Sequence, residues 1–184
     1  MDKYSKEDLD LALAYLKYRP RYDADVYETI MDYCKEGGSG TSVAVDVGCA
    51  SGQSTVALSL YFDKVIGVDI NPAHIDRAPI DNPKIEFRVS AAEDMSYIDS
   101  HSVDLVTIAT ALHWMDHTLF YKEVERILKP RGTIAVYGYA TGFFPGCPEA
   151  NDIFLKVRFV SLQMSSNAYL SCKKRLGRWK LNFS

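Results

Sequence analysis

The sequence predicts an α/β domain in which helices cover both faces of a sheet of parallel strands. Five short runs rich in β-branched residues recur between residues 42 and 137, and helical patterns or turns separate them. The 184 residues, with 11 glycines and 7 prolines, suit one domain with a core of its own. Strands that alternate with helices form βαβ units, whose strands run parallel.

The first 40 residues are predicted to be helical. Residues 5–17 carry leucines at helical spacing after a serine that can cap a helix. Pro20 disfavours the helical conformation for the residue before it, so the helix is expected to end there. A second helix is expected from residue 23 or 24 to residue 34, followed by a glycine-rich connector. We expect residues 1–40 to form a helical lid.

The five strands follow in regular order. They are predicted at residues 42–47, 64–69, 84–89, 103–108 and 133–137. Helices are expected at residues 53–62, after Asn71 as cap with Pro72 in the first position, and from Asp116 as cap to Leu128. Ligands of such sheets bind outside the carboxyl ends of the strands, so we expect the functional residues there.

Composition and charge exclude several classes of protein. Lys+Arg is 21 and Asp+Glu is 24, a net charge of −3 that does not favour binding to nucleic acid or to a membrane surface. Apolar runs fall short of the roughly 20 residues of a membrane-spanning helix, and the N-terminus is too charged for a signal peptide. The 4 cysteines form no C-x-x-C pair, which argues for reduced, structural thiols. We expect a soluble, cytoplasmic protein.

The strongest local motif lies between the first predicted strand and the helix after it. It reads Asp46-Val47-Gly48-Cys49-Ala50-Ser51-Gly52, and glycine there lets the backbone approach a ligand beside free helix N–H groups. A phosphate-binding loop would need a lysine after the last glycine, and the dinucleotide fingerprint would meet Ala50 and Gln53. The spacing better resembles the Asp-x-Gly-x-(Gly/Ala)-x-Gly turn with which methyltransferases hold a nucleoside–amino-acid ligand.

Acidic residues follow the next two strands. Asp69 ends the second strand, about 20 residues after the glycine turn, where a carboxylate can accept the hydroxyl protons of a ribose. Its alternative role as a helix cap is already filled by Asn71. After the third strand comes Ala91-Ala92-Glu93-Asp94-Met95, where a backbone N–H and a carboxylate can read an adenine edge. An acidic pair that faces water is the alternative.

These three signals in this order resemble the class I S-adenosylmethionine-dependent methyltransferases of the methyltransferase type 11 superfamily. The resemblance covers residues 15–140. Residues 102–106 and 126–132 are similar to the family's fourth-strand motif and to its R-x-L-K-P-G-G turn. Residues 18–22 and 111–116 resemble the Y-R-P-x-Y and A-x-H-W-F-D segments of the trans-aconitate-methyltransferase-like subgroup. The resemblance implies a Rossmann-like core over residues 41–140 and S-adenosylmethionine as the cofactor.

The resemblance also implies roles for individual residues. The turn after the first strand would contact the methionine end of the cofactor, and Asp69 would hold the ribose with Ile70 against the adenine. The implied cofactor-binding set is Asp46, Gly48, Ala50, Gly52, Asp69, Ile70, Ala92, Glu93, Asp94, Ala109 and Thr110. The implied substrate-side residues are Tyr18, Arg19, His113 and Trp114.

The sequence departs from the family pattern at two places. Ala50 replaces the middle glycine of the turn, and Ser90-Ala91-Ala92 replaces the usual Gly-Asp-Ala, which makes Glu93 the better adenine-edge candidate. His113 and His117 do not share a helical face, because the predicted helix begins between them, so no metal site is expected. His74 and His101 are expected at the surface.

The implied function is methyl transfer to a small-molecule acceptor, with His113 as the candidate base for an amine or a hydroxyl. The family's sheet ends with an antiparallel hairpin, whereas residues 141–184 show no clear strand–turn–strand pattern, and their basic cluster is interpreted as a solvated or disordered tail. We therefore expect an atypical or incomplete C-terminal segment and a shortened form of the family. A non-catalytic cofactor-binding or regulatory homologue and a nicotinamide-dependent enzyme are the alternatives.

Overall fold

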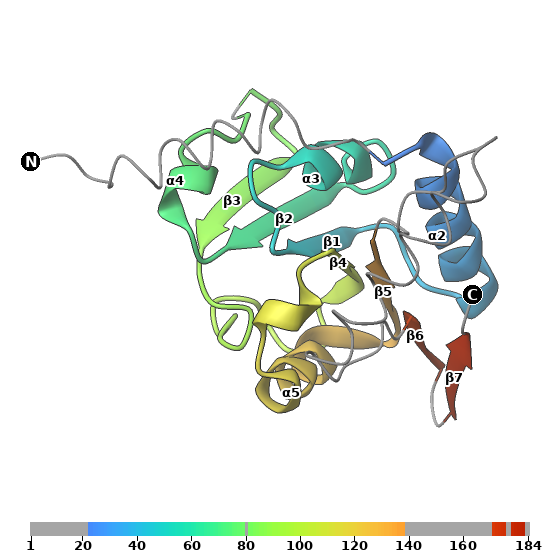
Figure 1. Cartoon of the computed structure of the whole chain (residues 1–184). Coiled ribbons are helices and arrows are strands. Elements are labelled where there is room, and N and C mark those ends of the chain that lie inside the picture. The colour runs from blue at the N-terminus through green and yellow to red at the C-terminus, as the bar shows by residue number, and fades with distance from the viewer. Residues whose placement is uncertain (1–21, 80, 139–170, 176–177, 183–184) are drawn as a thin grey trace, which may run out of the picture.

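The computed structural model describes residues 22–79, 81–138, 171–175 and 178–182 (Figure 1). Its main sheet has five parallel strands in the order β3-β2-β1-β4-β5. The strands are β1 (Val43–Val47), β2 (Lys64–Asp69), β3 (Ile85–Val89), β4 (Val103–Ala109) and β5 (Leu128–Tyr137). The strand order reverses between β1 and β4, the point at which such sheets bind ligands. The predicted fold class is confirmed.

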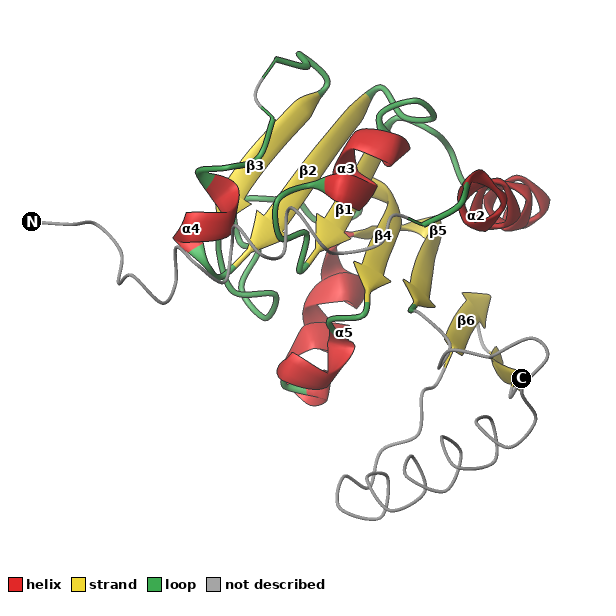
Figure 2. Cartoon of the chain, turned by 45° about the horizontal axis from the view of Figure 1, so that its top comes forward, coloured by secondary structure: helices red, strands yellow, loops and turns green. Residues whose placement is uncertain are grey.

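Helices cover both faces of this sheet (Figure 2). They are α2 (Ala24–Gly37), α3 (Gln53–Leu58), α4 (Pro72–Ile75), the 3-10 turn η1 (Leu112–Trp114) and α5 (His117–Ile127). One apolar cluster joins α5 to the sheet through Phe120, Val124 and Ile127. A second cluster joins α2 and α3 to the opposite face through Ile30 and Leu58.

The alternation of side chains along β1 explains why both faces are apolar. Val45 and Val47 pack into the α5 cluster, whereas Ala44 packs into the α2 and α3 cluster. Successive side chains of a strand point to opposite faces, so a strand buried on both sides must be apolar throughout. Asp46 is the exception within β1, and its partners are described below.

The caps predicted at Asn71 and Asp116 are confirmed, and some element ends differ. Asp116 Oδ1 accepts the N–H groups of Thr118 and Leu119 at 2.9 and 3.1 Å and so caps α5. Asn71 Oδ1 accepts the N–H of Ala73 at 2.9 Å and caps α4. Three boundaries were wrong: α2 extends to Gly37 instead of residue 34, α3 ends at Leu58 and turns follow it, and β5 begins at Leu128 instead of residue 133. The early part of β5 pairs with β4 through an irregular register.

Asp104 joins three strands at the amino edge of the sheet. Its carboxylate accepts the N–H groups of Ser42 and Val43, both at 3.0 Å, where β1 begins. Lys129 Nζ lies 2.8 Å from both carboxylate oxygens. The Asp104 side chain is only 3% exposed, so its charge is matched by a cation and by two backbone dipoles in a largely dry environment.

A second, two-stranded antiparallel sheet consists of β6 (Ser171–Arg175) and β7 (Arg178–Asn182). It lies beside β5 in both views and does not join the main sheet by hydrogen bonds (Figures 1 and 2). This strand–turn–strand unit was not predicted, because residues 171–175 are basic without apolar alternation and the alternation of Trp179 and Leu181 is short. The basic cluster therefore lies in a hairpin and was wrongly interpreted as a tail.

Several expectations fall outside the described residues. They concern the helix at residues 5–17, Tyr18, Arg19 and the ambiguous segment 152–164. Among the helices that are described, none combines the length and the apolar character needed to cross a bilayer.

Candidate functional site

The turn between β1 and α3 has an unusual backbone. Gly48, Ala50 and Gly52 all have positive φ, at 67°, 47° and 86°. A Cβ atom at Gly48 would lie 2.5 Å from the Cβ of Ala111, so this position also requires glycine for space. Ala50 adopts the left-handed conformation that the predicted glycine would favour, at a modest cost for a small residue. The substitution at position 50 therefore preserves the turn.

Asp46 anchors this turn from inside the protein. Its carboxylate accepts hydrogen bonds from the hydroxyls of Thr55 on α3, at 2.7 Å, and of Thr107 on β4, at 2.9 Å. Burial raises the pKa of Asp46 to about 6, although the two threonine hydroxyls partly offset this effect. Asp46 is buried, and both of its oxygens are used within the protein. These contacts make it a support for the turn.

Asp69 ends β2 directly beside the same turn. Its Oδ2 accepts the N–H of Ala50 at 2.8 Å, and its Oδ1 accepts the N–H of Asn71 at 2.8 Å. Burial raises the pKa of this carboxyl, but the neighbouring His74 imidazole and the two backbone N–H groups outweigh burial and lower it. Asp69 is thus ionised at neutral pH and retains lone pairs beyond the two that these bonds use.

His74 lies against this carboxylate. Its Nδ1 is 3.6 Å from Asp69 Oδ1, and its side chain is only 13% exposed. The prediction that His74 is a surface residue was wrong, because α4 begins immediately after Asp69 and its first turn places residue 74 beside the strand end. His101, by contrast, is exposed as predicted.

The hydroxyl of Ser51, in the middle of the glycine turn, is buried. It has no hydrogen-bond partner among the described residues. Buried polar groups are nearly always paired, so an orphan hydroxyl calls for a ligand or a water as partner. A ligand or a water at the turn would supply this partner.

Apolar side chains lie exposed where β2 and β3 end. Ile70 is 72% exposed and Val89 is 52% exposed. Tyr97 is also partly exposed, and the guanidinium of Arg88 lies 5.1 Å from the centre of its ring. Exposed apolar residues beside an ionised carboxylate suit a ligand that has both an aromatic and a polar part.

The loop after β3 places its three candidates differently. Ala92 is buried, Asp94 is exposed, and Asp94 Oδ1 accepts the N–H of Ser96 at 3.2 Å. Glu93 Oε1 accepts the N–H of Asp116 at 2.8 Å, just before α5. The Glu93 carboxylate therefore joins this loop to the segment that contains His113.

A second polar contact fastens this loop to α5. Glu123 Oε1 accepts the N–H of Met95 at 2.9 Å, and Arg126 donates to the carbonyls of Met95 and Ile98. Glu123 and Arg126 also pair with each other at 2.7 Å. The loop after β3 and helix α5 are thus held together near both ends of the helix.

Ala109 and Thr110 lie where β4 ends. Both are partly buried, and Thr110 has a φ of 56°, which is rare for a β-branched residue. The N–H of Thr110 donates to the carbonyl of Tyr137 at 2.8 Å, and its hydroxyl lies 2.6 Å from the hydroxyl of Tyr22. This end of β4 therefore has a strained, well-supported backbone.

His113 and Trp114 are exposed on η1. Trp114 is 83% exposed, and its ring centre lies 4.9 Å from that of His113. His117 is the first residue of α5, and its Nε2 lies 3.1 Å from the carbonyl oxygen of Leu112. Over the described part of the chain, no three histidine, cysteine or acidic side chains gather as metal ligands would.

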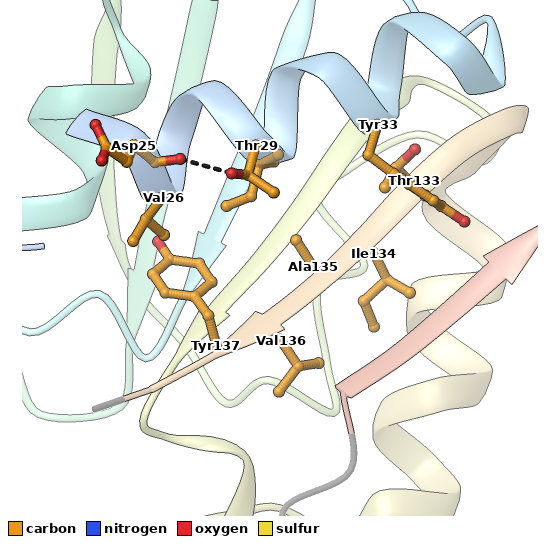
Figure 3. Close-up of a pocket in the computed structure, with 10 residues that line it drawn as sticks. Asp25, Val26, Thr29, Tyr33, Thr133, Ile134, Ala135, Val136 and Tyr137 are labelled. Carbon is orange, nitrogen blue, oxygen red and sulfur yellow. Dashed lines mark hydrogen bonds between the residues drawn. The ribbon is translucent and has the colours of Figure 1, made fainter. Parts of the chain in front are cut away.

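A separate groove runs between α2 and the edge strand β5 (Figure 3). Its volume is ≈ 360 Å³, and Val26, Ile30 and Tyr33 on α2 face β5 across it. The side chain of Tyr137 lines the groove, while its hydroxyl donates to Ser54 at 3.1 Å. The groove therefore adjoins the carboxyl edge of the sheet at Tyr137.

The structure thus brings the turn after β1, Asp69 and the end of β4 together at one edge of the sheet. Sequence reasoning missed four contributors: Thr55, Thr107, Tyr22 and His74. Tyr22 closes the Y-R-P-x-Y segment and could have been singled out there. The two threonines carry no sequence signal. Thr55 lies on a different element from its partner Asp46, and Thr107 is far from Asp46 along the chain.

Known proteins resemble this chain in sequence and in fold. Residues 45–136 match the family model described as a methyltransferase domain. The structure also resembles that of an Anaeromyxobacter dehalogenans protein described as a type II methyltransferase, with a TM-score of 0.64 and 30% identity. That match covers 77% of this chain and 59% of the other.

Two curated relatives extend the comparison. A Dictyostelium discoideum protein that bears a methyltransferase name is 37% identical over 138 residues, which is 74% of this chain and 50% of the relative. The Saccharomyces cerevisiae "Probable S-adenosylmethionine-dependent methyltransferase CRG1" is 34% identical over 148 residues, 77% of this chain and 50% of the relative. The chain thus spans about half the length of these relatives. The family model matches half of the chain, and the fold and the glycine turn agree with it. This chain therefore belongs to the methyltransferase domain family.

Proposed function

We propose that this chain binds S-adenosylmethionine and serves methyl transfer to a small-molecule acceptor. The observation that carries the proposal is the ionised carboxylate of Asp69, placed at the end of β2 and bonded to the glycine turn of β1. A ribose diol needs two acceptors in one place, which a partly used carboxylate provides. The turn beside it has positive φ at Gly48, Ala50 and Gly52, and Gly48 is partly exposed.

The residues present fit the proposed cofactor. The orphan hydroxyl of Ser51 requires a polar partner at the turn, and the amino-acid end of S-adenosylmethionine is polar. Ile70 offers an exposed apolar surface for the adenine, beside Asp69 for the ribose. Gly48, Ala50 and Gly52 would accommodate the methionine end, with Ala109 and Thr110 beside it. Asp46 would act by holding the turn.

The adenine edge would be read by the loop after β3. We assign this role to the N–H of Ala92 and to Asp94, which is exposed, in place of Glu93, which the sequence had favoured. The Glu93 carboxylate already accepts the N–H of Asp116 and so connects two loops. In this proposal, Glu93 links the adenine side to the segment that faces the acceptor.

S-adenosylmethionine, when bound, supplies a methyl group already activated on a sulfonium, so the protein mainly has to align the acceptor. Trp114 and His113 are exposed on η1 and would face that acceptor. The His113 imidazole would accept the proton of an amine or a hydroxyl, whereas a carboxylate acceptor needs no base. Tyr18 and Arg19 would close the acceptor side, with the N-terminal segment as a lid.

We assign the chain to the trans-aconitate-methyltransferase-like subgroup. Two segments support this assignment: the Y-R-P-x-Y sequence that ends at Tyr22 and the His113-Trp114 loop after β4. Tyr22, the last residue of the first segment, bonds to Thr110 just before the second segment, which supports the assignment. A small organic acid or a similar polar metabolite is therefore the first acceptor class to test.

Titration calorimetry with S-adenosylmethionine and with NAD tests the cofactor. We expect saturable binding of S-adenosylmethionine alone. A screen of small-molecule acceptors with methyl-labelled cofactor then tests transfer. Binding without transfer to any acceptor would favour the non-catalytic alternative, and binding of NAD alone would overturn the proposal.

His113→Ala tests the proposed base. We expect turnover of an amine or hydroxyl acceptor to fall by about 100-fold or more, with cofactor affinity unchanged. His101→Ala, which removes an exposed histidine just before β4, is the control. Unchanged turnover in His113→Ala would remove His113 from the mechanism.

A further inference from the structure

Thr110 occupies a costly backbone conformation at the candidate site. Its φ is 56°, in the left-handed region that β-branched residues rarely adopt. It follows β4 directly, next to Ala111, and Ala111 presses on the glycine turn so closely that a Cβ at Gly48 would lie 2.5 Å from it. The backbone of residues 109–111 is therefore in contact with the glycine turn. A change in the backbone conformation of Thr110 would shift both segments.

Tyr22 holds Thr110 from the side. The Tyr22 hydroxyl lies 2.6 Å from Thr110 Oγ1, and these residues are 88 positions apart in the sequence. The Tyr22 ring packs edge-on against Tyr137, with ring centres 4.8 Å apart and planes at 79°. Tyr137 in turn accepts the N–H of Thr110 through its backbone carbonyl at 2.8 Å. Thr110 is thus held by its hydroxyl and by its N–H.

A neighbouring tyrosine provides a contrast within the same cluster. Tyr27 also packs near Tyr137, with ring centres 6.4 Å apart, but its hydroxyl pairs with Ser54 at 3.2 Å. Tyr22 and Tyr27 therefore make similar aromatic contacts and differ in the polar group that their hydroxyls reach.

We propose that Tyr22 is a positioning residue that holds Thr110 in its left-handed conformation, so that residues 109–111 and the glycine turn fit the amino-acid end of the cofactor. The inference rests on the proposed function. Tyr22 acts here through Thr110 and not by touching the cofactor. A ligand that lacks the amino-acid end should therefore not depend on Tyr22.

Calorimetry with two ligands tests whether Tyr22 acts on the amino-acid end of the cofactor alone. S-adenosylhomocysteine carries the amino-acid end, and 5′-methylthioadenosine lacks it. We expect Tyr22→Phe to weaken S-adenosylhomocysteine about tenfold, the size of one lost hydrogen bond, and to leave 5′-methylthioadenosine within twofold. Tyr27→Phe, which removes the neighbouring hydroxyl, should change neither affinity.

A rescue experiment tests the role of the backbone. Glycine and asparagine adopt positive φ more readily than threonine, so Tyr22→Phe combined with Thr110→Gly or with Thr110→Asn should restore affinity for S-adenosylhomocysteine. The second double variant guards against a folding defect in the first.

Four outcomes would overturn the inference: unchanged affinity in Tyr22→Phe, equal weakening of both probes, the same selective loss in Tyr27→Phe, or failure of both rescues in folded protein. Failure of the parent chain to bind S-adenosylhomocysteine would instead overturn the proposed function itself.

Discussion

Asp69 and Asp104 lie at opposite edges of the same sheet, and each carboxylate accepts two backbone N–H groups. At the amino edge, Asp104 also pairs with Lys129 at 2.8 Å, and its side chain is 3% exposed. At the carboxyl edge, Asp69 has the His74 imidazole at 3.6 Å, and its side chain is 11% exposed. The Asp104 carboxylate is neutralised by a cation. The Asp69 carboxylate lies beside the glycine turn, in which three residues have positive φ and the Ser51 hydroxyl has no partner among the described residues.

The difference separates a carboxylate that stabilises the fold from one that is available to a ligand. Asp104 has its charge matched and its oxygens occupied by the protein. Asp69 keeps acceptor capacity, and its lowered pKa keeps it ionised. Asp46, one strand away, resembles Asp104 in its role, because side-chain hydroxyls occupy both of its oxygens. Substitutions at these aspartates should therefore affect different properties.

The largest effect on stability is expected for Asp104→Ala. The change leaves the N–H groups of Ser42 and Val43 without their acceptor and Lys129 without its partner, so the free energy of unfolding should fall by about 2–4 kcal/mol. Chemical denaturation followed by circular dichroism measures this loss. A loss below 1 kcal/mol would contradict the structural role given to the amino edge.

Asp46→Asn tests whether the Asp46 carboxyl is buried away from solvent. The folded-state pKa of about 6 lies above the ordinary value near 3.9, so Asp46 favours the folded state at low pH and loses this contribution as pH rises from about 4 to 6. The free energy of unfolding of Asp46→Asn minus that of the parent chain should rise by roughly 3 kcal/mol across this window. Asp69, whose pKa is lowered, contributes in the opposite direction and loses stability as pH falls. A flat difference for Asp46→Asn would mean that solvent reaches this carboxyl.

Gly48→Ala tests the turn between these aspartates. The new Cβ would lie 2.5 Å from the Cβ of Ala111, which cannot rotate away, and the φ of 67° adds strain. We expect a loss of stability of about 1–3 kcal/mol, together with weaker binding of S-adenosylmethionine. Ala50→Gly is the matched control, and it should be tolerated because residue 50 already has positive φ. A fully stable Gly48→Ala would contradict the close approach of the two segments.

Local patterns predicted the sheet and much of the candidate site. The β-branched runs predicted every strand of the main sheet, and Asp69 was placed correctly because it directly ends one of them. The caps Asn71 and Asp116 were also predicted, since a cap bonds to its own next residues. Such features depend on neighbours in the sequence, which are visible without a fold.

Contacts between distant segments could not be predicted in this way. Glu93 bonds to the backbone of Asp116, and Tyr22 bonds to Thr110, across 23 and 88 positions. The positive φ of Thr110 also has no local signal, because threonine normally avoids it. The antiparallel hairpin of β6 and β7 was missed because residues 171–175 are basic without alternation and the alternation in residues 178–182 spans only five residues.

The most direct test of the account is the affinity of S-adenosylmethionine for Asp69→Ala and for Asp104→Asn, measured by titration calorimetry beside the parent chain. We predict that Asp69→Ala weakens binding by about 100-fold, as expected for lost hydrogen bonds to a charged acceptor, and that Asp104→Asn stays within twofold. Equal affinities in Asp69→Ala and in the parent chain, or no binding by the parent chain, would contradict the assignment of Asp69 to the ligand.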